Sequence, residues 1–190
     1  ITYLALAAAG VNGMKKKKEG PTKVSREDQI VATNPILESY GNAKTARNDN
    51  SSRFGKFIRI HFTQSGKLAG CDIVSYLLEK SRITEQQEVE RSYHIFYQLV
   101  QPFGDNIEEG VRKRCCLSKN IKDYMYVSQG KTHVESINDN EDFEFTEDAF
   151  NILGFGNQEK WDCYMLTAGV MACGEIEFKT KGRDDQAECE

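Results

Sequence analysis

Residues 48–57 of this 190-residue chain read Asn48-Asp49-Asn50-Ser51-Ser52-Arg53-Phe54-Gly55-Lys56-Phe57. The first six carry two amides, two hydroxyls and a guanidinium, and a run that alternates like a strand follows, from Lys56 to Phe62. Short amide and hydroxyl side chains bond to nearby backbone and so favour irregular, turn-like conformations. Such a donor-rich loop, ending in a planar cation, suits recognition of phosphate oxygens and a hydrated Mg²⁺. The alternative is a polar surface loop that caps the next strand, and composition alone leaves both open.

The pattern N-x-N-S-S-R-F-G-K-F resembles switch I of the myosin motor domain. Kinesins share the N-x-x-S-S-R core, but there a Ser-His pair normally follows the arginine, whereas Phe54-Gly55-Lys56 follows it here. Further segments similar to the myosin motor domain are residues 34–38 (NPILE), 41–45 (GNAKT), 57–62 (FIRIHF), 76–82 (YLLEKSR) and 90–98 (ERSYHIFYQ). The resemblance runs along essentially the whole chain and is densest between Asn34 and Gln98.

For the fold, the resemblance implies an α/β fragment of a P-loop NTPase-type motor domain that occupies residues 1–190. It assigns residues from about 10 to 25 to loop 1, residues 48–55 to switch I, and residues from about 56 to 80 to the transducer hairpin. Residues 88–190 are expected to be mainly helical and to belong to the upper part of the head. The switch loop, the transducer strands and the surrounding helices are therefore the expected parts.

The resemblance also assigns roles to four residues of the loop. Asn48 is expected to donate to the phosphates of ATP, and Ser51 to lie near the γ-phosphate, where it orients the attacking water or relays its proton. Ser52 is expected to place its hydroxyl on Mg²⁺, a cation that prefers oxygen ligands. Arg53 is expected to pair with a switch II glutamate that lies outside this sequence. The expected catalytic residues are thus Ser51 and Arg53; the expected cofactor-binding residues are Asn48, Ser51 and Ser52, with Ser52 as the metal ligand.

The function implied by the resemblance is that of an ATP-driven, actin-based motor, of which this chain is an interior piece. Residues 58–62, 66–70 and 90–94 are most similar to muscle-type conventional (class II) heavy chains. That class implies light chains and a second heavy chain as partners, a coiled-coil tail outside this chain, and a cytoplasmic place in the muscle thick filament. The alternative is a non-hydrolysing actin-binding or scaffold protein that retains the motor fold. The intact Ser51, Ser52 and Arg53 weigh against it.

The two ends of the chain predict a piece of a longer protein. Ile1, Leu4, Ala5 and Ala8 recur at helical spacing, yet nothing precedes Ile1 to cap a helix. The phosphate-loop motif G-x-x-x-x-G-K-[ST] does not occur in the sequence. Preorganised electrostatics need the missing phosphate-loop lysine and switch II glutamate. We therefore expect the isolated chain to hydrolyse no ATP at motor-like rates.

Composition argues against several other classes of function. A net charge of −4 gives no general attraction to nucleic acid or to an anionic membrane. The single basic run, Lys15 to Lys18, lacks the interleaved aromatic residues of a nucleic-acid binder. No apolar run approaches the roughly 20 residues that a transmembrane helix requires. The six cysteines show no C-x-x-C spacing, so reduced thiols are expected rather than a zinc site or a disulfide framework.

Local patterns predict the individual elements. Ser25 to Asp28 resembles a capping box that opens a helix, and Asn34-Pro35 predicts a second helix or a kink, with helix to about Lys44. Two strands, from Lys56 to Phe62 and from about Lys67 to Lys80, are expected to form a hairpin with a bulge at Gly70. The remaining expectations are helices over residues 88–100, 108–117, 146–154 and about 158–173, an extended segment over 124–130, an acidic loop over 137–142, and a strand near 176–178. His61 is expected on a strand face, and His94 as a core histidine with its hydrogen bonds satisfied.

Overall fold

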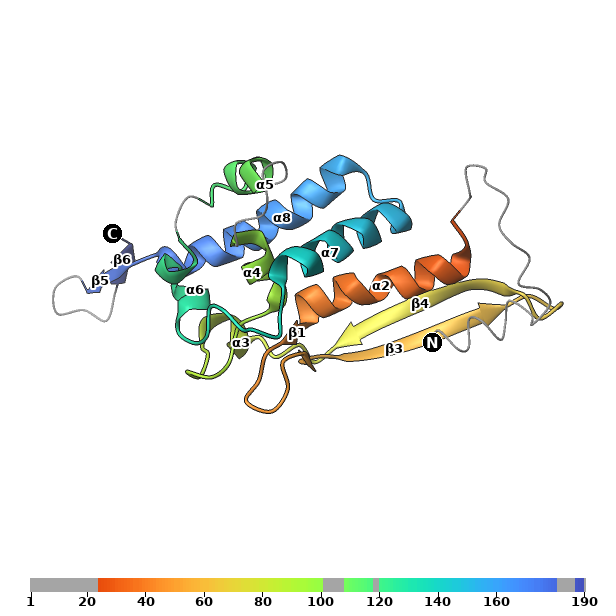
Figure 1. Ribbon diagram of the computed structural model, residues 1–190, viewed down its shortest axis with the longest axis horizontal. Helices are drawn as coiled ribbons and strands as arrows, with labels where there is room; N and C mark the ends of the chain where they lie inside the picture. Colours follow the sequence, from red (N-terminus) through yellow and green to blue (C-terminus); the bar gives the residue numbers. More distant parts are fainter. Residues whose placement is uncertain (1–23, 101–107, 118–119, 181–186, 190) are drawn as a thin grey trace.

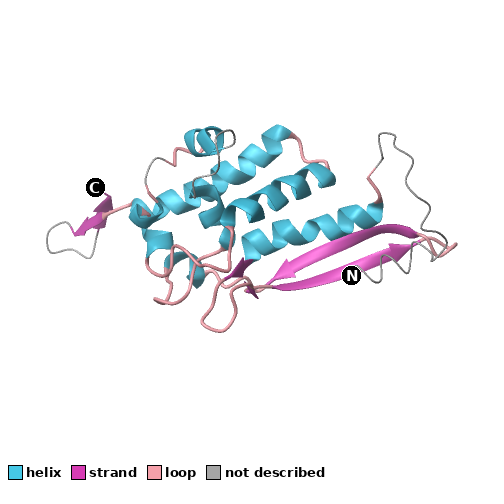
Figure 2. Ribbon diagram, viewed as in Figure 1, coloured by secondary structure: helices cyan, strands magenta, loops and turns pink. Residues whose placement is uncertain are grey.

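The computed structural model describes residues 24–100, 108–117, 120–180 and 187–189, and combines helices with short antiparallel sheets (Figure 1, Figure 2). A long β-hairpin lies along one side, helix α2 runs beside it, and helices α7 and α8 follow in turn (Figure 1). The expected first helix and nearly all of the expected loop 1 lie outside the described residues. Among the described residues, none of the helices is long and apolar enough to cross a membrane.

Helix α2 (Arg26–Gly41) begins as its sequence predicts. The Ser25 hydroxyl accepts a hydrogen bond from the Asp28 N–H at 3.1 Å, and the Asp28 carboxylate accepts one from the Ser25 N–H at 3.4 Å, which confirms the capping box. Of the second helix or kink expected at Asn34-Pro35, the separate helix does not form, because α2 continues through Pro35 to Gly41. A proline costs one backbone hydrogen bond. The packing of α2 against β4, α4 and α7 outweighs that local preference.

Strands β3 (Gly55–Phe62) and β4 (Leu68–Tyr76) form the expected hairpin. They pair antiparallel from Gly55 opposite Tyr76 to His61 opposite Gly70, and the register then shifts so that Phe62 lies opposite Leu68. The bulge thus lies beside Gly70, as predicted, but the strand ends at Tyr76 rather than at Lys80.

The alternation along β3 agrees with the sequence pattern as far as His61. Ile58 and Ile60 are half-buried, whereas Phe57, Arg59 and His61 are exposed. Phe62, which the pattern puts on the face of the two isoleucines, lies past the register shift and is exposed. The His61 ring lies 2.7 Å from the Asp72 carboxylate on the neighbouring strand, so His61 is a strand-face residue as expected.

Helix α4 (His94–Val100) is the centre of the core, because each of its seven residues is buried. The helix expected from Glu88 begins only at His94. Residues 88–89 form a turn instead, the Arg91 N–H then bonds to the Lys44 carbonyl at 3.1 Å, and Tyr93 forms a bridge with Ala43. Pairing with a distant part of the chain therefore replaces the first turns of the expected helix.

Helices α7 (Asp139–Leu153) and α8 (Asn157–Ala172) form the outer helical layer. The expected α8 is confirmed, but α7 starts seven residues before the expected cap at Thr146 and replaces the expected acidic loop. Asn138 caps α7 by accepting hydrogen bonds from the backbone N–H groups of Asn140 and Glu141. The acidic residues thus occupy a first helical turn, where the helix dipole favours negative charge.

The remaining elements are short. They are the pair β1 (Asn42–Ala43) and β2 (Ser51–Ser52), α3 (Ser81–Thr84), α5 (Glu108–Arg114), the 3₁₀ helices Ile121–Asp123 and Cys173–Glu175, α6 (Met125–Ser128), and the pair β5 (Phe178–Thr180) and β6 (Ala187–Cys189). The expected helix near 108–117 is confirmed in its first part. The expected extended segment at 124–130 is wrong, since Tyr124 instead caps α6, and its side chain belongs to the core with that of Val127.

A buried ion pair joins the start of α4 to the start of α7. The Arg91 guanidinium, which is fully buried, lies 2.8 Å from the Asp139 carboxylate and 3.6 Å from the centre of the Tyr97 ring. Burial raises the pKa of Asp139, and the charge of Arg91 opposes that rise. Among the described residues, Arg91 Nε, one of its terminal nitrogens and Asp139 Oδ1 have no hydrogen-bond partner, so the single bond between the two groups carries much of their mutual neutralisation.

We expect Arg91→Met to lower the free energy of unfolding by about 3 kcal/mol, because the Asp139 carboxylate would stay buried without its cation. Adding Asp139→Leu to Arg91→Met should recover much of that loss, since apolar side chains can replace a buried ion pair at little cost. Urea unfolding of the wild type, the single variant and the double variant measures both effects. A single variant within about 0.5 kcal/mol of wild type would show that the pair does not stabilise the fold.

Candidate functional site

The loop of residues 44–50 stands on a short stem of paired backbone. Strand β1 (Asn42–Ala43) pairs antiparallel with β2 (Ser51–Ser52), with Asn42 opposite Ser52 and Ala43 opposite Ser51. The expectation of a wholly irregular loop is therefore wrong at its end, where Ser51 and Ser52 are extended. Because successive side chains of a strand point to opposite faces, the two serine hydroxyls lie on opposite sides of the stem.

The amide side chains fold the loop on itself. Asn48 accepts a hydrogen bond from the Asn50 N–H at 2.9 Å. The Asn50 side chain accepts one from the Asn42 amide at 2.9 Å and donates one to Glu38 of α2 at 3.1 Å. Lys44 pairs with Asp49 at 2.6 Å. The side chains at 48–50 therefore stabilise the loop itself, as expected for a polar surface loop that leads into the next strand.

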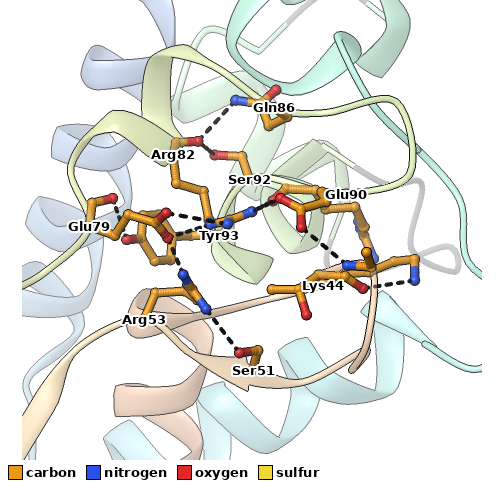
Figure 3. Close-up of polar contacts among 12 residues, drawn as sticks. Lys44, Ser51, Arg53, Glu79, Arg82, Gln86, Glu90, Ser92 and Tyr93 are labelled. Atoms are coloured by element: carbon orange, nitrogen blue, oxygen red, sulfur yellow. Dashed lines mark hydrogen bonds and ion pairs between the residues drawn. The ribbon is translucent and has the colours of Figure 1, made fainter.

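Arg53 connects the loop to the segment after β4 (Figure 3). Its Nε lies 2.7 Å from Glu79 Oε2, and its terminal nitrogen donates to the Ser51 hydroxyl at 3.2 Å. The backbone repeats the connection, because the Glu79 N–H donates to the Arg53 carbonyl at 3.0 Å. The chain reaches this position through Leu77, whose φ of +56° is rare for a residue with a side chain.

Glu79 belongs to a group of four charged residues, Arg53, Glu79, Arg82 and Glu90, which we call the ion cluster (Figure 3). Arg82 Nε lies 2.7 Å from the same Glu79 oxygen that Arg53 contacts, and another Arg82 nitrogen lies 2.9 Å from Glu90. Glu90 in turn accepts a hydrogen bond from the Ala46 N–H at 3.1 Å. The cluster therefore contacts the loop near both of its ends.

The cluster favours ionised carboxylates. Burial by itself would raise the pKa of Glu79, but hydrogen bonds from Arg53 and Arg82 outweigh it and hold that pKa below its usual value. Burial likewise opposes ionisation of Glu90, whose pKa is nevertheless lowered by Arg82 and the Ala46 N–H. The pKa of Arg82 is raised, because its two carboxylate partners outweigh its burial. Near neutral pH the cluster thus holds two cations and two anions.

The four residues singled out in the sequence, Asn48, Ser51, Ser52 and Arg53, lie close together in the sequence but do not converge on one point. Ser51 and Arg53 are in contact, whereas the exposed Ser52 hydroxyl donates to the Phe54 carbonyl at 3.2 Å. Asn48 is exposed and helps to line a cavity of about 560 Å³ formed with residues of α2, α4 and α7. Within the described part of the chain, no group of three or more His, Cys, Asp or Glu residues could hold a metal ion.

His94 lines the same cavity and corrects an expectation. It is buried as predicted, with 6% of its surface exposed, but its Nδ1 has no hydrogen-bond partner among the described residues. Burial and the nearby positive charge of Arg91 lower the pKa of His94 to about 4. The ring is therefore neutral near pH 7 and adds no charge beside the loop.

Little in the sequence pattern identifies Glu79 and Arg82 as parts of the site. They lie 26 and 29 positions after Arg53 (79 − 53 and 82 − 53). The strand was expected to continue to Lys80, so the sequence pattern did not predict the turn at Leu77. One available signal was the spacing of Glu79 and Arg82, which puts opposite charges three residues apart. It identifies a local ion pair but not its contact with the loop.

Comparison with known protein families agrees with the resemblance. The model of the family described as myosin head (motor domain) matches residues 1–190, which is the full length of the chain. That description names no class of myosin.

The lowered pKa of Glu90 fixes how the stability should depend on pH. A carboxyl group whose folded-state pKa is lowered stabilises the fold above its unfolded pKa, about 4.3 for glutamate, and loses this effect as the pH falls through the folded-state pKa. We expect Glu90→Gln to lower the thermal unfolding midpoint near pH 7, and the difference from wild type to shrink below about pH 4. Calorimetry over that range measures it.

Glu144→Gln is the matched control, since Glu144 is an exposed glutamate of α7 outside the ion cluster. It should leave the midpoint near pH 7 close to that of the wild type. A Glu90→Gln deficit that stayed constant into acid would contradict the prediction.

Proposed function

Because the chain belongs to the myosin head (motor domain) family, whose members are ATPases and actin-based motors, we propose that residues 48–55 are its nucleotide-sensing switch I. The observation that carries the proposal is the contact of Arg53 with both Ser51 and Glu79. One planar cation thus joins a candidate catalytic hydroxyl to a fixed carboxylate outside the loop. A loop held in this way can present its hydroxyls to a phosphate in a defined orientation.

The residues fit a magnesium nucleotide by the chemistry of their donors. Ser52 is exposed, and because its hydroxyl donates its proton to a carbonyl, its oxygen lone pairs remain for a hard cation. Ser51 accepts its hydrogen bond from Arg53, so its own proton is available to another acceptor. Mg²⁺ and ATP together would supply the charge neutralisation and the transferable phosphoryl group.

Each side chain then has a separate task in the hydrolysis of ATP. Ser52 would hold Mg²⁺, and Asn48 would donate to the phosphates. Ser51 would orient the attacking water or relay its proton toward a phosphate oxygen. Arg53 holds the Ser51 hydroxyl in place by a hydrogen bond, and Glu79 is the ion-pair partner of Arg53 in this chain. The switch II glutamate, expected from the resemblance, would be a second partner supplied from outside this sequence.

At a finer level, we infer a muscle-type conventional (class II) myosin. Residues 58–62, 66–70 and 90–94 support this class. The corresponding partners are the actin filament, light chains and a second heavy chain, and the corresponding place is the cytoplasmic thick filament. In the same scheme, β3 and β4 are the transducer hairpin, through which the nucleotide state reaches the actin site.

The second candidate is a non-hydrolysing actin-binding scaffold with the same fold. It would need none of the contacts among Ser51, Arg53 and Glu79 for its function. Loss of turnover on changing Arg53 therefore distinguishes the two candidates.

We expect Arg53→Ala, in a motor protein that contains this chain, to leave ATP binding largely intact and to slow hydrolysis by at least about 100-fold, because Ser51 loses the group that orients it. Rapid mixing with a fluorescent ATP analogue measures binding, and single-turnover quenching measures hydrolysis.

Arg112→Ala is the control for Arg53→Ala. Arg112 lies in α5 and donates to the Leu117 carbonyl, away from the loop. Near-wild-type single-turnover rates in Arg53→Ala would refute the role of Arg53. Turnover that is absent from the wild type as well would favour the scaffold.

We expect Ser52→Ala to weaken the binding of Mg²⁺, so that turnover needs a higher concentration of the metal. The Mg²⁺ concentration for half-maximal turnover should rise about tenfold, because one oxygen ligand is lost. A magnesium titration of steady-state turnover measures the change. Ser128→Ala, in α6 and outside both the loop and the hairpin, is the control, and an unchanged titration curve for Ser52→Ala would remove Ser52 from the metal site.

A further inference from the structure

Arg82 is the least exposed member of the ion cluster, with 7% of its side-chain surface accessible. It does not touch residues 48–53 in the contacts described above, yet it shares a carboxylate oxygen with Arg53 (Figure 3). Both Nε atoms lie 2.7 Å from Glu79 Oε2. A carboxylate held between two guanidinium groups cannot turn toward one without loosening its bond to the other.

On the basis of the proposed function, we propose that Arg82 is a positioning residue for Arg53, acting through the carboxylate of Glu79. The direction of the Arg53 guanidinium, and with it the contact to Ser51, is thus set by a side chain outside the switch. Arg82 itself touches neither nucleotide nor metal in this scheme.

The geometry requires a guanidinium at position 82. One edge of it faces Glu79, with its Nε at 2.7 Å and a terminal nitrogen at 3.4 Å. The other terminal nitrogen bonds to Glu90 at 2.9 Å and to the Arg91 carbonyl at 3.3 Å. A lysine ammonium is a point charge and lacks this planar fork, so it cannot reproduce the directions of these bonds.

The backbone of Arg82 is fixed as well. Its carbonyl accepts hydrogen bonds from the Ser92 hydroxyl at 3.0 Å and from the Gln86 amide at 2.9 Å (Figure 3). Ser92 is buried next to the core helix α4. Arg82 therefore transmits the position of the core, rather than that of a mobile surface, to Glu79 and Arg53.

The test uses a motor protein that contains this chain and the variant Arg82→Lys, which keeps the charge. We expect single-turnover hydrolysis of Mg-ATP to slow about tenfold while the KM for ATP changes less than about twofold, because small misplacements of a catalytic group lower the rate of the chemical step. Arg112→Lys is the matched control, since its guanidinium bonds to the Leu117 carbonyl in another part of the chain.

A double-mutant cycle separates positioning from general structural support. In an Arg53→Ala background, Arg82→Lys should change the hydrolysis rate by less than about twofold, since there is no guanidinium left to position. An equal slowing in both backgrounds, or a wild-type rate for Arg82→Lys alone, would overturn the proposal. If Arg82→Lys does not fold, Glu79→Gln provides the same cycle. Glutamine has the size of glutamate but no charge, so it weakens the link between the two arginines.

The two proposals fail in different ways. If Arg53→Ala keeps the wild-type rate, the proposed function itself is wrong and the role of Arg82 falls with it. If Arg53→Ala is slow but Arg82→Lys is not, the proposed function stands and only the positioning role is wrong. Thermal unfolding midpoints of all variants, compared with wild type, show whether a slow variant has simply lost its fold.

Discussion

The contact of one carboxylate with two guanidinium groups is the constraint on which the loop depends. Glu79 is only partly buried, so its charge could be solvated, but its bonds to Arg53 and Arg82 fix its direction. Removing ions from water is costly unless each keeps a partner of opposite sign. The ion cluster meets this condition with two cations and two anions. The attraction between these ions thus offsets the cost of removing them from water. The same contacts bring the end of β4, α3 and the loop together.

The loop is also joined to the core by its backbone. The Lys44 carbonyl accepts from the Arg91 N–H, and Ala43 bridges to Tyr93, which leads directly into α4. Arg91 in turn spans to Asp139 at the start of α7. A displacement of the stem would therefore disturb a close-packed interior, which resists gradual deformation. The glycines near the stem fit the same picture, because a Cβ at Gly55 would overlap the Tyr76 ring.

Local sequence signals predicted the elements whose causes are local. The Ser25 capping box, the two strands of the hairpin and the helix expected over about 158–173 depend on residues close together in the sequence, and each was confirmed. The late start of α4 could not be predicted in this way, because Ala43 and Lys44, distant in the sequence, pair with the backbone of Tyr93 and Arg91. For the site, the motif identified the loop, but the partner of Arg53 depends on the left-handed turn at Leu77, which is not a residue that favours one.

The two-residue ladder between β1 and β2 gives Ser51 and Ser52 a different support from that of residues 46–48. Separating the ladder would break the stem away from α4, whereas the exposed residues 46–48 are held by hydrogen bonds at the surface. The surface contacts can therefore be exchanged for contacts with a ligand without undoing the pairing that aligns Ser51 and Ser52. The serine pair thus takes its position from the body of the protein and not from the tip of the loop.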